Sequence, residues 1–237
     1  MSSNHIVRSF DEQLRRLDNL IAEMGGLAEV QLSEAIEALV RRDVDRAAEV
    51  AAADSRLDEM EVEIDRHAIN LLALRQPMAK DLREIVGALK VSGMIERIGD
   101  YAKNVAKRTV SLVEMAPVPS NQTVARLGQL AQEMVKDVLD AYVERDIEKA
   151  ASVRHRDKDV DALYTSIFRE LLTYMMEDAR SISACTHLLF AAKNFERVGD
   201  HATNIAEIVE FLVEGRVEFD ERPKEDTSSF AIVEPHA

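Results

Sequence analysis

The segment ERIGDYAKN at residues 96–104 returns as ERVGDHATN at residues 196–204, and this repetition shows how the chain is organised. Six of the nine positions are identical, at an offset of 100 residues. Upstream, RDVDRA at 42–47 matches RDIEKA at 145–150, at an offset of 103 residues. One duplication explains both matches, because self-similarity at a fixed spacing marks a repeated structural unit. The smaller offset downstream predicts a turn shortened by three residues in the second half.

The spacing of apolar residues predicts that both units are helical. Apolar residues recur at steps of three and four, for example Leu127, Ala131, Met134, Val138 and Ala141. This spacing places them on one stripe of a helix, suited to burial in a bundle. Proline is absent from residues 1–76 and 120–222, and long proline-free stretches rich in Ala, Leu, Glu and Arg favour long helices. The sequence therefore predicts an all-α protein.

Breaks in the pattern divide the chain into six helices. Asp43 and Asp146 are each placed to cap the N-terminus of the helix that follows. The expected breaks are Arg42-Asp43, 75–77, 116–120, Arg145-Asp146 and Glu214-Gly215.

These breaks predict two tandem three-helix bundles related by internal duplication. The first covers residues 5–115 and the second 121–215, with a Pro-rich linker at 116–120. Residues 216–237 are mostly polar and are predicted to form a disordered tail.

Composition and charge narrow the possible functions. The 237 residues include 44 Asp and Glu against 30 Lys and Arg, a formal net charge of −14. We expect no nucleic-acid partner, because phosphate contacts need clustered basic residues. The single cysteine, Cys185, fits a reducing compartment. The N-terminal residues lack the apolar core of a signal peptide, and no run of about 18 apolar residues could span a bilayer. We therefore expect a cytoplasmic protein that reaches a membrane only through partners.

The repeated segment carries a row of oxygen-bearing side chains. Positions i, i+4 and i+8 of a helix lie along one stripe, which groups the sets Glu96, Asp100, Asn104 and Glu196, Asp200, Asn204. The preceding helices carry the pairs Asp54, Asp58 and Asp157, Asp161. An antiparallel turn brings each pair beside its row. Because hard cations prefer such oxygen ligands, the pattern predicts one metal site in each half.

Two simpler interpretations remain open. Acidic residues on a helix often form only a solvated face. Arg97 and Arg197 could also neutralise the carboxylates without any metal. His201 directly follows Asp200, so it projects away from the row and is expected to be a neighbour of the site. No nucleophile, base and orienting group come together in the sequence, and no Gly-rich phosphate loop is present.

The two repeated segments resemble the PhoU family of bacterial phosphate-transport accessory and signalling proteins. The segment QPMAKDLR at 76–83 is similar to another motif of that family. The resemblance covers about residues 5–215. It implies a PhoU-like fold of two tandem bundles and a non-enzymatic regulator that restrains phosphate uptake and the starvation response when phosphate is plentiful. It also implies two partners, the ATPase subunit of the phosphate ABC transporter and a sensor histidine kinase.

The resemblance also implies divalent or trivalent metal ions, with Fe, Zn, Mn and Mg as candidates. Family members bind metal clusters through repeated Glu/Asp-x-x-x-Asp motifs. Glu96, Asp100, Glu196 and Asp200 match these motifs most closely, and Asp54, Asp58, Asp157 and Asp161 match less tightly. Tyr101 departs from the pattern, since the corresponding residue of the second half is His201. This departure implies that the first half binds metal differently or less well.

Competing functions use the same features. A helical-bundle metalloenzyme would use the same carboxylates around an open coordination position. A structural helical scaffold would hold no metal. Long amphipathic helices indicate a homodimer, although they also suit a monomer.

Overall fold

The structure, a computed structural model, describes residues 2–75, 77–215, 226 and 228. These residues form six α-helices and one short 3-10 helix. The α-helices are α1 (Ser2–Arg41), α2 (Val44–Arg75), α3 (Lys80–Val113), α4 (Asn121–Glu144), α5 (Ile147–Glu177) and α6 (Ile182–Glu214), with the 3-10 helix at Ala179–Ser181. The all-α prediction is confirmed, while the predicted tail lies almost entirely outside the described residues.

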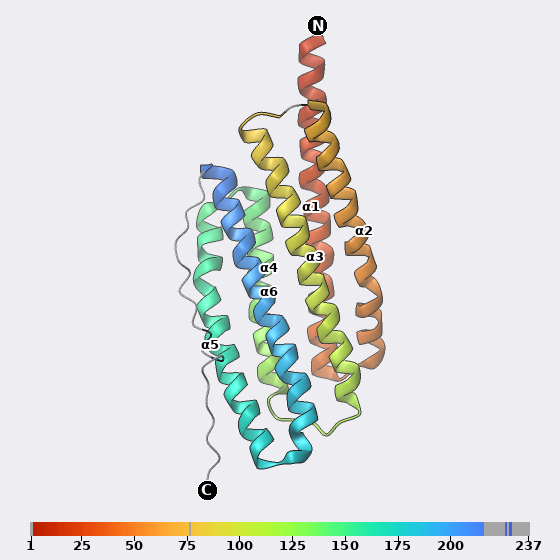
Figure 1. The fold of residues 1–237 in the computed structure, drawn as a ribbon, viewed down its shortest axis with the longest axis vertical. Coiled ribbons are helices and arrows are strands. Elements are labelled where there is room, and N and C mark those ends of the chain that lie inside the picture. The colour runs from red at the N-terminus through yellow and green to blue at the C-terminus, as the bar shows by residue number, and fades with distance from the viewer. Residues whose placement is uncertain (1, 76, 216–225, 227, 229–237) are drawn as a thin grey trace.

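Four of the helices form the centre of the molecule and two lie at its sides. α1 packs on α3 and α4, and α6 packs on the same two helices. α2 contacts only α1 and α3 among the described elements, and α5 contacts α4, α6 and the 3-10 helix. Figure 1 shows α2 and α5 at opposite sides of the elongated bundle. The two three-helix units therefore share one central four-helix layer.

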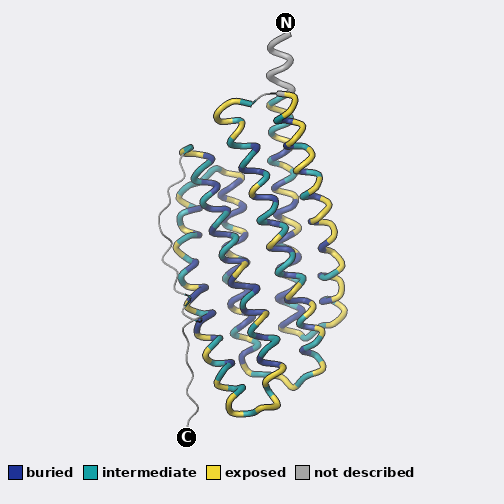
Figure 2. The backbone as a smooth tube through the Cα atoms, viewed as in Figure 1, coloured by how far each residue is buried: buried dark blue, intermediate teal, exposed yellow. Residues whose placement is uncertain are grey.

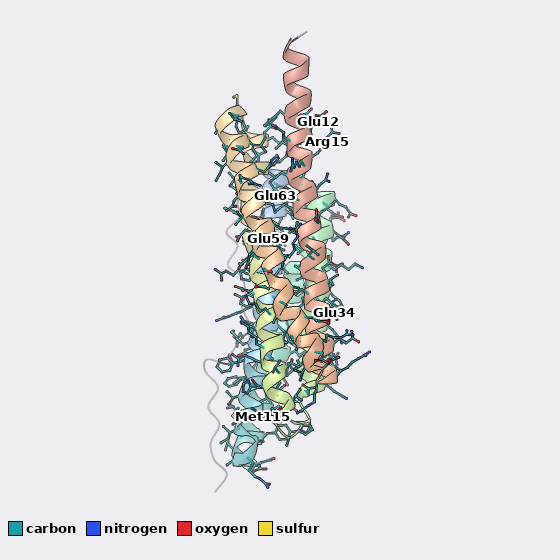
Figure 3. All side chains as sticks on the ribbon, turned by 90° about the vertical axis from the view of Figure 1, so that its right-hand side faces the viewer. Glu12, Arg15, Glu34, Glu59, Glu63 and Met115 are labelled. Atoms are coloured by element: carbon teal, nitrogen blue, oxygen red, sulfur yellow. The ribbon has the colours of Figure 1, made fainter. Side chains whose placement is uncertain are left out.

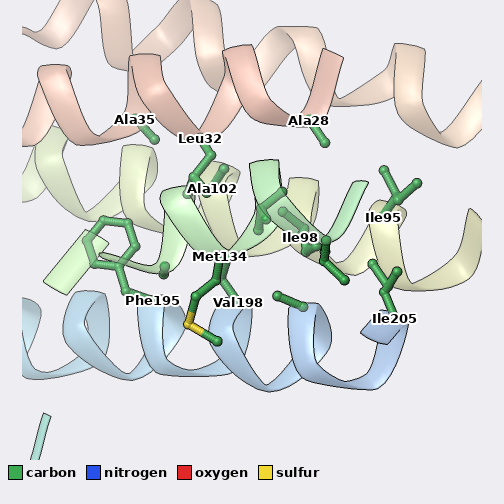
Figure 4. Packing of buried hydrophobic residues seen from close by; sticks show 14 of the residues in the cluster. Ala28, Leu32, Ala35, Ile95, Ile98, Ala102, Met134, Phe195, Val198 and Ile205 are labelled. Carbon is green, nitrogen blue, oxygen red and sulfur yellow. The ribbon is translucent and has the colours of Figure 1, made fainter. Parts of the chain in front are cut away.

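The core runs through this central layer without interruption. Figure 4 shows α1, α3, α4 and α6 contributing side chains to one cluster, with Leu32, Ile98, Met134 and Phe195 among those labelled. All four are fully buried. Figure 2 shows the same pattern along the backbone, with buried positions facing inward on each helix and exposed positions facing outward. Burial of an amphipathic stripe is what stabilises long helices such as these.

The repeated helix boundary has the same geometry in both halves. The Asp43 carboxylate accepts a hydrogen bond from the Arg46 backbone N–H at 3.0 Å, and Asp146 accepts from the Lys149 N–H at 3.0 Å. The preceding Arg42 and Arg145 both have left-handed backbone conformations, with φ of 55° and 56°. Both predicted N-caps are confirmed, and the duplication is visible at the level of single hydrogen bonds.

The sequence predicted a shorter connection between the last two helices of the second half, and this prediction is wrong. Residues 76–79 separate α2 from α3, and residues 178–181 separate α5 from α6, so the two connections have equal length. The repeat offset falls by three residues because α5 ends earlier than α2 and α6 begins later than α3, relative to their repeat positions. In the second half the connection is itself wound into the 3-10 helix, which Asp178 caps through the Arg180 N–H.

Acidic side chains lie along the side of the molecule that α1 and α2 form. Figure 3 shows Glu12 and Glu34 on α1 and Glu59 and Glu63 on α2, along one side of the molecule. None of the helices, within the described ranges, is both long and apolar enough to cross a bilayer.

Candidate functional site

The acidic residues buried in the structure coincide with the predicted site. Among the described residues, the buried acidic side chains are Asp54, Asp157, Asp161 and Glu196, each with a relative exposure of 9% or less. All four belong to the predicted metal-ligand set. A buried carboxylate is costly unless it is paired or hydrogen-bonded. These residues therefore do more than form a solvated acidic face.

In the first half, Asp54 is satisfied by groups of the chain itself. Gln31 of α1 donates from Nε2 to Asp54 Oδ1 at 3.3 Å. The Lys103 ammonium of α3 forms a close ion pair with Asp54 Oδ2 and lies 3.4 Å from Asp100 Oδ1. Hydrogen bonding to Asp54 raises the pKa of Lys103, which keeps the ammonium charged. The α2–α3 interface thus contains a cation of its own between two predicted ligands.

The other end of the first-half row carries excess negative charge. Burial, together with the nearby carboxylates of Asp100, Glu61 and Asp58, raises the pKa of Glu96 to about 7. Arg97 opposes this shift, with its Nε 3.6 Å from Glu96 Oε2 and its Nη1 3.5 Å from Asp100 Oδ2. The predicted neutralisation by Arg97 is therefore present, over an exposed and weak pair of contacts.

In the second half, the lysine is at a different position. Lys193 of α6 lies 2.8 Å from Glu196 Oε1 and 3.2 Å from Asp226 Oδ2, with its ammonium 4.8 Å from the centre of the Tyr164 ring. Burial raises the pKa of Glu196 to about 7, although the hydrogen bond from Lys193 opposes the shift. Glu196 Oε2 is buried and has no hydrogen-bond partner among the described residues.

The glycine of each repeat lets the acidic helices approach closely. A Cβ at Gly99 would overlap Leu57 Cδ1 of α2 and lie 3.6 Å from Asp54 Oδ1. A Cβ at Gly199 would lie 3.3 Å from Val160 Cγ1 of α5 and 3.6 Å from Asp157 Oδ1. The equal distances to the two aspartates confirm that the repeats align at offsets of 100 and 103.

The structure brings some of the predicted ligands together and separates others. Asp58 is exposed, whereas its counterpart Asp161 is buried. Asn104 is also exposed, whereas its counterpart Asn204 is half-buried. Within the described ranges, no three His, Cys, Asp or Glu side chains are arranged to hold one metal ion. The metal-ligand set stays a prediction.

Tyr101 and His201 meet each other rather than the carboxylates. Tyr101 Oη lies 3.3 Å from His201 Nε2, and the two ring centres are 5.5 Å apart. The Arg197 guanidinium lies 5.8 Å from the centre of the Tyr101 ring. Residues at equivalent positions of the two repeats thus touch where α3 packs on α6. The difference between Tyr and His belongs to this contact between the halves. That His201 is a neighbour of a metal site rather than a ligand stays a prediction.

Sequence reasoning missed four residues of the site. One of them is Lys103, which stands where the second repeat has Thr203, so this signal was visible in the sequence. Gln31, Lys193 and Asp226 come from positions outside the repeated segment, and only the tertiary structure brings them to the carboxylates.

Comparison with known families gives a consistent result over both halves. The PhoU domain matches the chain twice, at residues 21–109 and 124–209. The chain is 51% identical over 228 residues to a phosphate-specific transport system accessory protein PhoU homolog of Caulobacter vibrioides, covering 96% of this chain and 99% of that protein. A protein of the same name from Rhizobium meliloti is 49% identical over 230 residues, covering 97% of each chain.

Solved structures agree with these sequence matches. PhoU from Pseudomonas aeruginosa superposes with a TM-score of 0.85 at 41% identity, covering 87% of this chain and all of that one. The phosphate transport system regulatory protein PhoU from Streptococcus pneumoniae gives a TM-score of 0.82 at 27% identity, covering 88% of this chain and 99% of that one.

Proposed function

The chain belongs to the PhoU family, and from this membership we propose that it is a non-enzymatic regulator of phosphate uptake. The observation that carries the proposal is the match over nearly the whole length to proteins named as accessory proteins of a phosphate-specific transport system. A match of this extent includes both halves and the interface between them. The regulatory role is therefore assigned to the whole six-helix body.

We propose that the protein acts in the cytoplasm by restraining its partners when phosphate is plentiful. The partners are the ATPase subunit of the phosphate transporter and a sensor histidine kinase of the starvation response. A rigid helical body can regulate by binding one conformation of a partner better than another, which shifts the partner's equilibrium.

Metal ions are a further part of the proposal. The residues that would hold them are the predicted ligands of the two repeats, which are Glu96, Asp100, Glu196 and Asp200 with Asp54, Asp58, Asp157 and Asp161 beside them. Among the residues that the structure describes, Glu196 Oε2 is buried and has no hydrogen-bond partner. A divalent or trivalent cation, such as Fe, Zn, Mn or Mg, would supply positive charge to oxygen ligands that otherwise repel one another. We propose that the ion has a structural role in holding the helices at this interface.

Deletion of the gene tests the regulatory role. In medium rich in phosphate, we expect the deletion strain to express alkaline phosphatase and to take up phosphate faster than the parent. The intact gene supplied on a plasmid should restore repression. Continued repression in the deletion strain would exclude the proposed role.

Binding to the transporter tests the proposed mechanism separately. We expect the purified protein to bind the purified ATPase subunit and to lower its rate of ATP hydrolysis. The purified protein alone should hydrolyse no phosphoester. Phosphoester hydrolysis that is lost when Asp200 is replaced by Ala would instead support a metalloenzyme.

We also propose a homodimer, which long amphipathic helices favour. Light scattering measured during size-exclusion chromatography should give a mass about twice the chain mass of 26.6 kDa. A mass equal to one chain would show that the monomer is the functional unit.

A further inference from the structure

Arg108 of α3 is a half-buried arginine whose charge is not paired within the described part of the chain. Its Nε atom is buried without a hydrogen-bond partner, and the guanidinium forms no ion pair with a described residue. Burial lowers its pKa. Its contact is with Phe190 of α6, whose ring centre lies 4.3 Å from Arg108 Cζ. An unpaired cation partly withdrawn from water is costly, so this position is not explained by stability.

His187, one turn before Phe190 on α6, adds a second nitrogen without a partner. Its Nδ1 atom is buried and has no hydrogen bond to any residue that the structure describes. Burial lowers the pKa of His187, and the positive charge of nearby Arg108 acts in the same direction. Arg108, His187 and Phe190 together form what we call the seam cluster. It brings nitrogen atoms from two helices close together at a place of excess positive charge.

The duplicated half shows that the packing of α3 on α6 does not require this cluster. At an offset of 100 residues, the seam cluster corresponds to Ile208, Gly87 and Lys90. Ile208 is buried, and a Cβ at Gly87 would lie only 2.7 Å from Leu212 Cδ2. The equivalent crossing of the two helices is thus closed by apolar groups. Arg108 and His187 are additions to one end of the seam.

The C-terminus of α3 does not require Arg108 either. Cations near the end of a helix can bind its free carbonyl groups. In α3 this part is taken by Arg42, whose guanidinium donates to the carbonyls of Leu112 and Met115. Arg108 lies more than one turn before Val113, the last residue of the helix. Capping of α3 therefore does not explain the unpaired guanidinium.

The donors of the seam cluster fit a phosphate oxyanion. A guanidinium that lies over an aromatic ring uses its face for that contact and keeps the N–H groups of its edge free to donate. Such an edge binds phosphate or carboxylate through two parallel hydrogen bonds. The imidazole adds a donor from a second helix. A phosphate dianion compensates two positive charges, those of Arg108 and a protonated His187, whereas a carboxylate compensates only one.

We propose that Arg108 and His187 form a phosphate site at the α3–α6 seam, which includes none of the predicted metal ligands. Arg108 donates from the edge of its guanidinium and His187 from its ring, while Phe190 holds the guanidinium in place. The ligand is inorganic phosphate or the phosphate group of a larger molecule, since both present the same oxygens. A link between this site and phosphate control rests on the proposed function, whereas the binding itself does not.

Phosphate titration of the full-length protein, followed by nuclear magnetic resonance, tests the site. The protein is labelled with ¹³C at histidine Cε1, and the signal of His187 is the one that disappears in His187→Phe. At constant pH and ionic strength, we expect inorganic phosphate to move this signal and to saturate it in the millimolar range. Acetate at the same concentrations should leave the signal in place. A signal that phosphate does not move, or that acetate moves equally, would overturn the proposal.

Arg108→Gln and Lys107→Gln form a matched pair, because each removes one positive charge from adjacent positions of α3. Lys107 is exposed and projects about 100° away from Arg108 around the helix. We expect K107Q to bind phosphate within about twofold of the wild type and R108Q to bind about tenfold or more weakly, because R108Q loses charge-assisted hydrogen bonds. Equal losses in the two variants would show only diffuse attraction of anions and would contradict the site.

Arg108→Lys provides a second test that does not depend on R108Q being folded. It keeps the positive charge but lacks the planar fork of donors, so it should bind phosphate more weakly than the wild type. Circular dichroism checks that each variant is folded. Wild-type affinity in R108K would contradict the role of the guanidinium.

Methyl phosphate identifies the source of the ligand. Tighter binding of inorganic phosphate than of methyl phosphate would support the free ion, and tighter binding of the ester would support a phosphate group on a larger molecule. Failure of both to bind would overturn the inference. The regulatory role would then still be judged by the deletion strain, which does not depend on this site.

Discussion

Single side chains at the acidic interfaces determine how the protein responds to pH. Glu196 has a pKa of about 7 in the folded protein, against 4.5 for the ordinary group. Between these two values the folded state holds a proton that the unfolded state has lost. The free energy of unfolding therefore falls as the pH rises from about 4.5 to 7, and then levels off.

Replacing Glu196 by Gln should remove the fall in the free energy of unfolding that accompanies rising pH. In metal-free protein, we expect E196Q and the wild type to have similar stability near pH 4. At pH 8, E196Q should be more stable by up to about 3 kcal/mol, the equivalent of the pKa shift. Urea denaturation at several pH values measures the difference. A difference that does not change with pH would show that Glu196 ionises normally in the folded state.

The glycines of the repeat give a second comparison at this scale. Gly99→Ala should destabilise the protein by about 1–3 kcal/mol, because its Cβ overlaps the buried Leu57 side chain. Gly199→Ala meets Val160 at 3.3 Å, and a small movement there is offset by up to about 1 kcal/mol of improved helix propensity. Thermal or urea unfolding should place G199A near the wild type and G99A clearly below it. Similar losses would mean that the two interfaces are packed alike.

Residue types and their spacing predicted the acidic positions but not their surroundings. Periodicity on a helix places Glu96 and Asp100 on one side, and the repeat adds Asp54 as a neighbour. Whether a carboxylate is buried or exposed depends on its tertiary surroundings, as the contrast between Asp58 and its counterpart Asp161 shows. Gln31 reaches Asp54 from a third helix, and no local pattern reports such a contact.

At the scale of helices, the duplicated N-caps should contribute equally. Asp43→Ala and Asp146→Ala should each lower the free energy of unfolding by about 1 kcal/mol, since each removes one acceptor for a backbone N–H. Asn at either position keeps an acceptor and should cost much less. Urea denaturation of the four variants measures these effects. A loss at one position alone would show that the two boundaries are not energetically equivalent.

Helix positions were the most predictable part of the fold. Long stripes of apolar residues and the two capping aspartates are local signals, and the structure places the caps at the predicted residues. The length of the α5–α6 connection was not predictable, because a repeat offset records the total number of residues and not where they were lost. The three missing residues could have been lost from a helix end or from a turn, and the offset is the same in both cases.

For the whole molecule, the shared central layer predicts a single unfolding transition. Phe195 of α6 is fully buried, and its ring and Ile36 of α1 both lie beside Gly128 of α4. Phe195→Ala should cost about 3–5 kcal/mol. Because α1 and α3 share this core, hydrogen exchange should quicken in the helices of both halves. Faster exchange confined to α4, α5 and α6 would show that the halves unfold separately.

The contact between Tyr101 and His201 has a consequence for how such a chain can change over generations. When two separate, identical subunits pair about a two-fold axis, any residue on the axis faces its own copy, and every substitution occurs on both sides together. Joining the copies in one polypeptide removes that restriction. A phenol can then face an imidazole, and one acidic interface can acquire a lysine while the other keeps a threonine. Covalent linkage of the halves is thus what permits them to specialise.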